Sequence, residues 1–108
     1  MPKHRVLKQA RTLEHVFRPV EITDIDDGYH AFIVRYSGDY VTHHHAADEF
    51  IYILEGLILM ELDGESVEVR QGEAILVPAG TPHRPRCRNM ALALVMEKKG
   101  LQHESDAR

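Results

Sequence analysis

The chain contains 108 residues with a mass of 12.4 kDa, which corresponds to one domain. Apolar residues make up 44% and charged residues 28%, a composition that supports a core and excludes a disordered polar chain or a disulfide-dense miniprotein. Lys and Arg number 13 against 17 Asp and Glu, so the formal net charge of −4 gives no general affinity for nucleic acid or an anionic membrane. The single cysteine, Cys87, excludes an intrachain disulfide and an all-cysteine zinc site, and it fits a reducing compartment such as the cytoplasm.

Residues 1–29 are expected to form an N-terminal arm. The apolar pattern of residues 6–17 matches a short amphipathic helix, although a docking arm would show the same pattern; its apolar members are Val6, Leu7, Leu13, Val16 and Phe17. The basic first residues are followed by no apolar run, and no stretch of the chain approaches 18 apolar residues. We therefore expect neither a signal peptide nor a membrane span.

From residue 21 onward the chain shows the spacing of short β-strands, with apolar runs separated by turn signals. The runs lie at residues 30–36, 49–54, 57–62, 66–69, 74–77 and 91–97. Asp63-Gly64 between two of them is typical of a type I′ hairpin, because both turn positions favour positive φ. Strands with no helix between them exclude a βαβ arrangement and leave an all-β sandwich or closed barrel. The polar segment at residues 100–108 is expected to fray.

Histidine is unusually frequent, at 8 residues, and two of the histidines are two positions apart. On a strand, the side chains of His43 and His45 leave the same face about 7 Å apart, so their imidazoles can converge on one point. His44 then faces the other way and is expected to be exposed. Glu49 opens the next apolar run and can add a carboxylate.

His83 follows the sequence Pro78-Ala79-Gly80-Thr81-Pro82, a rigid corner that aims the next residue. A single histidine at a strand end is more often a surface or hydrogen-bonded residue than a ligand. Three imidazoles and one carboxylate together favour a divalent transition metal such as Mn, Fe, Zn, Ni or Cu. An octahedral ion would keep two positions for water or substrate. The remaining histidines have no motif around them and are assigned no role: His4, His15, His30 and His103.

Two sequence strings carry a resemblance to a known family. The first, His-x-His-x3-Glu-x6-Gly, occurs at His43, His45, Glu49 and Gly56; the second, Gly-x5-Pro-x-Gly-x2-His, occurs at Gly72, Pro78, Gly80 and His83. With these strings, residues 30–97 resemble the cupin superfamily. The sequence departs from the cupin motifs at Gly38, which lies one residue too close to the first histidine, and at Cys87, which replaces an Asn. The second change is expected to cost a structural contact rather than a ligand.

The resemblance implies a single cupin domain over residues 1–108, built as a small antiparallel β-barrel of the jelly-roll or double-stranded β-helix type. It implies one divalent ion per chain, bound inside the barrel by His43, His45, Glu49 and His83, and assembly as a homodimer. Glu49 is also the expected catalytic residue, because it can accept a proton when it leaves the metal. A small-molecule substrate and chemistry of the dioxygenase or isomerase type are implied, with no nucleic-acid or membrane partner.

Two alternatives to an enzyme stay open at this point. One is a non-catalytic, metal-dependent module that binds or senses a small ligand. It is suggested by the 15 residues between Gly56 and Gly72, which leave no room for an inserted lid. The other is a purely structural barrel, which four intact ligand positions disfavour. No set of Arg, Lys and Glu residues points to a phosphosugar substrate.

Strand alternation makes further predictions about side-chain direction. If His83 points inward, Cys87 does too, and the arginines between and beside them point outward: Arg84, Arg86 and Arg88. Those arginines form either an anion-binding stripe or a solvated or dimer-facing edge, and Cys87 is either a redox-tuning residue or a small buried hydrophobe. Ile51 and Ile53 are expected to face inward. Side chains at the barrel mouth or in the core are Tyr36, Tyr40, Met60 and Met96.

Two smaller expectations concern the connections and the assembly. Asp48 is expected to cap the connection before Glu49 rather than to bind metal. The apolar side of residues 6–17 lies outside both strings and needs a surface to cover it. A second copy of the barrel would supply that surface, which is the reason for expecting the homodimer with the arm at its interface.

Overall fold

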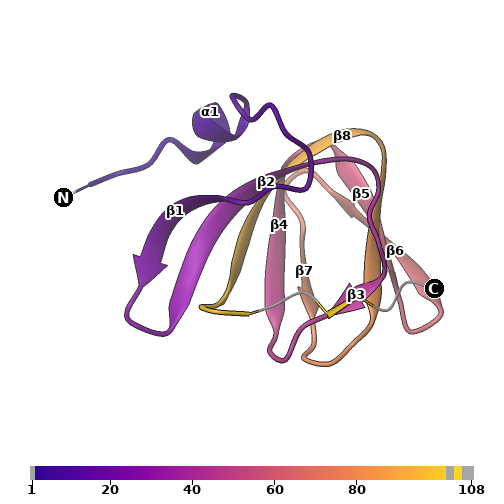
Figure 1. The fold of residues 1–108 in the computed structure, drawn as a ribbon. Helices are drawn as coiled ribbons and strands as arrows, with labels where there is room; N and C mark the ends of the chain where they lie inside the picture. The colour runs from indigo at the N-terminus through magenta and orange to yellow at the C-terminus, as the bar shows by residue number, and fades with distance from the viewer. Residues whose placement is uncertain (1, 102–103, 106–108) are drawn as a thin grey trace.

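Antiparallel strands make up most of this protein, whose structure is a computed structural model that describes residues 2–101 and 104–105. One short helix, α1, precedes the strands (Figure 1). The elements in chain order are α1 (Val6–Ala10), β1 (Val20–Ile25), β2 (Tyr29–Asp39), β3 (His43–His44), β4 (Glu49–Glu55), β5 (Leu57–Leu62), β6 (Glu65–Arg70), β7 (Ala74–Val77), β8 (His83–Lys98) and β9 (Glu104–Ser105). In the described part of the chain, no helix is long and apolar enough to cross a membrane.

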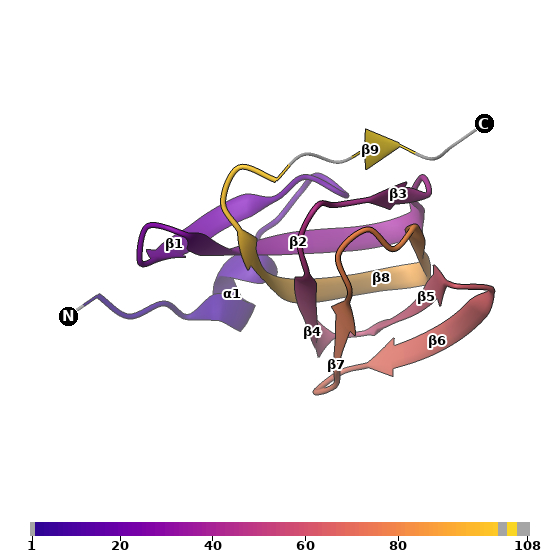
Figure 2. The ribbon, with the colours of Figure 1, turned by 90° about the horizontal axis from the view of Figure 1, so that it is seen from below.

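The long strand β8 organises the sheet. β2 pairs with β8 from Arg86 to Lys98, and β3 pairs with its first residue, His83. β5 pairs with the first half of β8 and β4 with the second half. β6 and β7 extend the sheet from β5 and β4, and every strand pairing is antiparallel. The strands curl around a common interior (Figures 1 and 2). This arrangement confirms the expected all-β, jelly-roll fold.

The interior of the barrel is filled by alternate side chains of the strands. Ile51 and Ile53 of β4 face it, as predicted, and are 1% and 0% exposed. The buried apolar core consists of Phe32, Val34, Tyr36, Ile51, Ile53, Ile58, Met60, Val69, Val77, Cys87, Ala91, Ala93 and Val95. Burial of these apolar side chains supplies the main driving force for folding.

The N-terminal arm packs on the outside of the same barrel. Ala10 is fully buried against Ile33 and Leu92, which lie on the outer faces of β2 and β8. The predicted helix over residues 6–17 is wrong beyond Ala10, because the chain turns there and Val16 forms a β-bridge with Arg35. The arm therefore packs its apolar side on its own barrel. The expectation that it needs a second copy of the barrel as a covering surface is wrong.

Three strand segments were missed by the apolar pattern. β1 is an edge strand with five of its six residues exposed, so it shows no alternation of apolar and polar residues. The first half of β8 is rich in arginine and proline. Beyond residue 100, where fraying was expected, β9 pairs with β3; residues 102, 103 and 106–108, including His103, lie outside the described residues.

The predicted hairpin at residues 63–64 is confirmed. Asp63 and Gly64 adopt φ angles of 48° and 75° between β5 and β6. Both angles are positive, as a type I′ turn requires.

We predict that two motif glycines differ sharply in their tolerance of alanine. Both adopt positive φ, at 83° for Gly56 and 84° for Gly72. A Cβ added to Gly56 would lie 2.3 Å from the carbonyl oxygen of Met90, whereas a Cβ added to Gly72 would have no atom within 4 Å. Gly72→Ala should cost about 1–2 kcal/mol of unfolding free energy through backbone strain alone. Gly56→Ala should cost about 2–5 kcal/mol, because the clash adds to the strain.

Urea unfolding followed by circular dichroism measures both costs. Equal destabilisation by the two substitutions would show that close approach to β8 is not the reason for glycine at position 56.

Candidate metal centre

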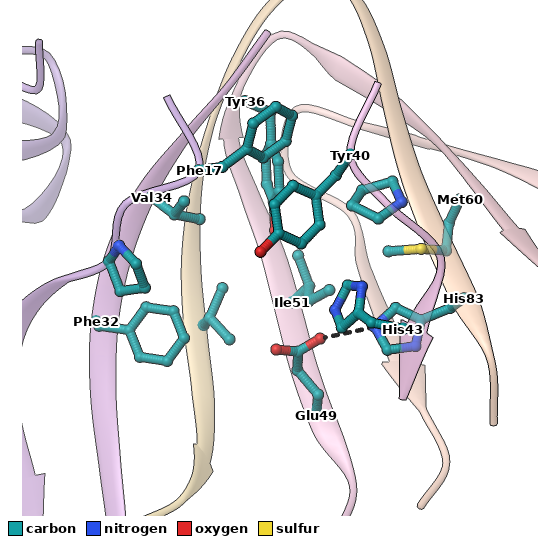
Figure 3. Close-up of a pocket in the computed structure, with 13 residues that line it drawn as sticks. Phe17, Phe32, Val34, Tyr36, Tyr40, His43, Glu49, Ile51, Met60 and His83 are labelled. Carbon is teal, nitrogen blue, oxygen red and sulfur yellow. Dashed lines mark ion pairs between the residues drawn. The ribbon is translucent and has the colours of Figure 1, made fainter. Parts of the chain in front are cut away.

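Four buried polar side chains meet at one end of the barrel interior. β3 carries His43, the segment after it carries His45, β4 begins with Glu49, and β8 begins with His83. His43 and His83 are register partners across β3 and β8. All four side chains are buried, with exposed fractions between 1% and 6%. The fold therefore brings the four predicted residues together, and Figure 3 shows three of them, His43, Glu49 and His83.

The distances between these side chains suit a shared ion. The ligand nitrogens of the three histidines lie within 4.8 Å of one another. Glu49 reaches two of them: its Oε2 is 3.5 Å from His45 Nε2, and its Oε1 is 3.4 Å from His83 Nε2. Ligands of one metal ion must share a coordination sphere, and this cluster meets that condition for the three imidazoles, with the carboxylate beside them.

Backbone hydrogen bonds orient two of the imidazoles. His43 Nδ1 donates to the carbonyl oxygen of Val41 and His83 Nδ1 to that of Thr81, both at 2.9 Å. Because each Nδ1 carries the proton, each Nε2 presents a lone pair to the cluster. Among the described residues, His83 Nε2 is buried and makes no hydrogen bond. A buried, oriented lone pair of this kind fits a metal ligand.

The charge state of Glu49 also suits a metal. Burial of Glu49 opposes its ionisation, but His45 and His83, when they carry a proton toward Glu49 in the metal-free protein, outweigh this effect and hold the pKa of the carboxyl well below its usual range. Positive charge on this side of Glu49 thus favours the carboxylate, the form that binds a cation. Neutral imidazoles with one carboxylate suit a divalent first-row transition metal.

Glu97, near the end of β8, is a site residue that sequence reasoning missed. It is the register partner of Glu49 on β4 and of His30 on β2, and it is 6% exposed. Its carboxylate groups with His45 and Glu49 as a second set of ligand atoms within 4.8 Å. Burial, with the adjacent charge of Glu49, raises the pKa of Glu97 to about 7. The inward phase of Ala91, Ala93 and Val95 was the signal that could have found it.

His30 links Glu97 to the surface. His30 Nε2 lies 3.7 Å from Glu97 Oε1, and its Nδ1 donates to the carboxylate of Glu21 at 2.7 Å. The Glu21 side chain is 60% exposed. Glu49, Glu97, His30 and Glu21 thus form a polar row across four strands, from the histidine cluster to solvent. His30 had been assigned no role from the sequence.

A small apolar cavity adjoins the cluster. Its volume is about 40 Å³, and His43, Glu49 and His83 form its polar end (Figure 3). Three of the side chains predicted at the mouth or core line it, namely Tyr36, Tyr40 and Met60, whereas Met96 does not. The other lining residues are Phe17, Pro19, Phe32, Val34, Ile51, Pro85 and Val95.

The arginine edge of β8 lies outside the cavity. Arg84 pairs with Asp39 at 3.0 Å, and Arg86 pairs with Glu61 at 3.0 Å and with Asp39 at 3.3 Å. These carboxylates neutralise the two guanidinium groups, so the geometry favours a solvated edge over an anion-binding stripe.

Three nearby side chains have structural surroundings. Cys87 is buried, and burial raises the pKa of its thiol, which fits a small hydrophobe. Asp48 accepts a hydrogen bond of 2.8 Å from the backbone N–H of Ala79, as the expected capping role requires. His44 is half-buried rather than exposed, because β9 pairs with β3 beside it.

We predict that the neutral variant Glu97→Gln changes how the stability of the metal-free protein depends on pH. The folded protein keeps the proton on Glu97 up to a pKa of about 7, whereas the unfolded chain releases it near 4.5. The metal-free protein should therefore lose stability as pH rises from about 4.5 to 7, by on the order of 2–3 kcal/mol.

Glu97→Gln should lack this loss. Urea unfolding of chelator-treated protein at pH 5 and pH 8 measures it in both forms, and a parallel pH dependence in the two would contradict the assignment to Glu97.

Comparisons with known proteins agree with this fold. The cupin domain family matches residues 32–96. Protein MJ1618 of Methanocaldococcus jannaschii is 49% identical over 41 residues, which is 38% of this chain and 33% of that protein. The 3-hydroxyanthranilate 3,4-dioxygenase of Bos taurus is 37% identical over 68 residues, which is 59% of this chain and 24% of that enzyme.

Among solved structures, protein NMB1881 from Neisseria meningitidis superposes with a TM-score of 0.81 at 26% identity. The match covers 91% of this chain and all of that one, at 100%. The chain spans less than two thirds of the curated relatives that it matches, between 24% and 58% of the first three. The family match covers more than half of the chain and includes all four predicted ligand positions. The chain belongs to the cupin family.

Proposed function

We propose that the protein is a metal-dependent cupin enzyme that acts on a small hydroxylated organic molecule by dioxygenase-type chemistry. The observation that carries the proposal is the group of three buried imidazoles beside an ionised carboxylate, at the polar end of an apolar cavity. The likeness to a dioxygenase of 3-hydroxyanthranilate, an aromatic compound, supports this reaction class over isomerisation.

One divalent ion per chain is proposed to bind His43, His45, His83 and Glu49. When bound, such an ion supplies Lewis-acid or redox chemistry toward oxygen atoms of a substrate. The side chains form a preorganised site, because backbone carbonyls fix His43 and His83 before any ligand arrives. The apolar walls exclude water from the reacting end and accept the carbon skeleton of the substrate.

Glu49 is the proposed catalytic residue. Its carboxylate lies at the cavity, where Oε1 or Oε2, once released from the metal, can take a proton from a substrate hydroxyl and pass it to Glu97, whose pKa of about 7 makes it the better proton acceptor. Glu97 and His30 continue from it toward the exposed Glu21. In this proposal they are the route by which a proton leaves the interior.

The metal ligands make the first test of the proposal. Protein purified without chelator should carry about one equivalent of a divalent transition metal per chain. His45→Ala and Glu49→Ala should weaken metal binding by at least tenfold, since each removes a ligand. Both variants should stay folded, because the core is apolar and its packing does not depend on the ion.

Elemental analysis and calorimetric metal titration measure binding, and circular dichroism reports folding. His44→Ala is the matched control, because His44 lies on the opposite face of β3, and it should bind metal like the parent. Unfolding of either ligand variant at room temperature would mean that the metal is structural and would overturn the catalytic proposal.

Oxygen consumption tests the reaction class. Iron-loaded protein supplied with 3-hydroxyanthranilate or simple catechols should take up oxygen, and Glu49→Gln should not. Binding of these compounds without turnover would favour the ligand-binding module instead. Zinc or manganese as the resident ion, with no oxygen uptake, would favour an isomerase.

A homodimer remains our proposal for the assembly, on a surface different from the helix of the arm. β1 is an edge strand in the described part of the chain, and Val20 and Ile25 on it, with Tyr29 of the neighbouring β2, are 42–55% exposed. Val16 of the arm is 44% exposed next to it. Pairing of two copies along this edge would cover apolar surface and unpaired backbone groups together.

We predict a molar mass of about 25 kDa by light scattering at micromolar concentration, twice the mass of the 12.4 kDa chain. Tyr29→Lys should shift the mass toward that of one chain by placing charge at the edge. A wild-type mass near 12.4 kDa would overturn the dimer.

A further inference from the structure

Phe17 is a wall of the cavity that does not belong to the barrel. It lies in the segment between α1 and β1, and its ring reaches over the barrel interior. The ring centroid is 4.7 Å from that of Tyr40 and 5.8 Å from that of Tyr36. Figure 3 shows these three rings gathered above Glu49, and the ring of Tyr40 also contacts that of His43, with a centroid distance of 5.1 Å.

The cavity is too small for an aromatic ligand while Phe17 lies in it. Its volume is about 40 Å³. A cavity that binds benzene has a volume of about 150 Å³, and one water needs roughly 10–15 Å³. The present space therefore accommodates a few water molecules, and a ring enters only if a lining side chain moves.

Phe17 is a lining aromatic side chain that lies outside the paired strands, as does Tyr40. Phe32 and Tyr36 sit in β2, whose backbone pairs with β1 on one edge and with β8 on the other. The segment of Phe17 is attached to the barrel by the N–H of Phe17, which donates to the carbonyl oxygen of Arg35 at 2.8 Å. A second bond runs from the Arg35 guanidinium to the carbonyl oxygen of Leu13 at 3.0 Å.

The backbone conformation of Phe17 is a second, independent reason to expect its ring to move. Its φ is 58°, in the left-handed region that residues with a large side chain rarely adopt. A strained conformation persists only where its surroundings hold it, and such positions concentrate at ligand clamps and switches. Relaxation of this φ would change the direction of the ring and enlarge the cavity without breaking the strand pairs of the barrel.

We propose that Phe17 is a specificity-determining residue that sets the size of the ligand admitted to the metal centre. Its ring closes the cavity in the ligand-free state and packs on the apolar body of a bound ligand whose oxygens face His43, Glu49 and His83. The ligand class is a flat, hydroxylated ring with few substituents opposite the hydroxyl groups. This inference rests on the proposed function of the cluster as a metal site that binds a small molecule.

The experiment uses full-length protein loaded with zinc, so that binding is measured without turnover. Calorimetry gives the Kd values of catechol, 4-methylcatechol and 4-tert-butylcatechol for the wild type, Phe17→Ala and Phe17→Gly. The wild type should bind catechol best. Both variants should improve binding of 4-tert-butylcatechol relative to catechol by at least tenfold.

Two matched comparisons separate the ring from general damage. Phe50→Ala removes an equal ring from the outer face of β4, away from the cavity, and should leave the order of the three ligands unchanged. Phe17→Gly should be more stable than Phe17→Ala in urea, because glycine adopts a φ of 58° without strain. Equal ligand preferences in the wild type and both Phe17 variants would overturn the inference and leave the metal site standing.

Failure of the proposed function gives a different result. If zinc binds but none of the catechols does, the substrate class is wrong, and the role of Phe17 is then decided by the rate at which 4-(2-pyridylazo)resorcinol, a bulky aromatic chelator, removes the zinc. Removal at least tenfold faster from Phe17→Ala than from Phe50→Ala supports closure by Phe17, and equal rates overturn it. If zinc does not bind the wild type, the proposed function and this inference both fail.

Discussion

The register of β8 is the constraint on which the site depends. Side chains of a strand alternate between its two faces, so His83 at the start of β8 and Glu97 near its end both point inward. Pairing of β8 with β3, β4 and β2 then places His83 opposite His43, and Glu97 opposite both Glu49 and His30. A slip of one residue would turn these groups to the outer face and direct the neighbouring arginines into the core.

The same register brings two carboxyl groups together in an apolar interior. Their neighbours lower the pKa of one and raise the pKa of the other. Glu49 faces His45 and His83, which hold its pKa low, whereas Glu97 faces Glu49 and is neutralised more readily, with a pKa of about 7. Two such groups at one site rarely ionise together without a cation. Opposed pKa shifts in adjacent groups are a feature of acid–base sites, and here they make Glu97, rather than Glu49, the carboxyl that holds a proton near neutral pH.

Local patterns were enough to predict that the histidines lie close together, and contacts between distant strands explain what these patterns missed. The spacing of His43 and His45 and the turn before His83 are short-range features, and the motif strings consist of such features. The place of Glu97 beside Glu49 depends on two strands whose paired residues are 48 positions apart in sequence, which no local pattern reports. The apolar spacing of the arm predicts one long helix, but a segment that packs on the outer face of a barrel shows the same spacing of apolar side chains.

The connections between the strands of this barrel are short, so they offer few segments that could cover the cavity. The 15 residues between Gly56 and Gly72 are used by β5, β6 and their turns, which leaves no inserted lid on that side. The arm takes this role because α1 is fixed on Leu92 at one end and β1 is paired with β2 at the other. The two ends of this segment stay in place while the side chain of Phe17 between them can change direction. The same arm therefore stabilises the outer face of the barrel and closes its interior.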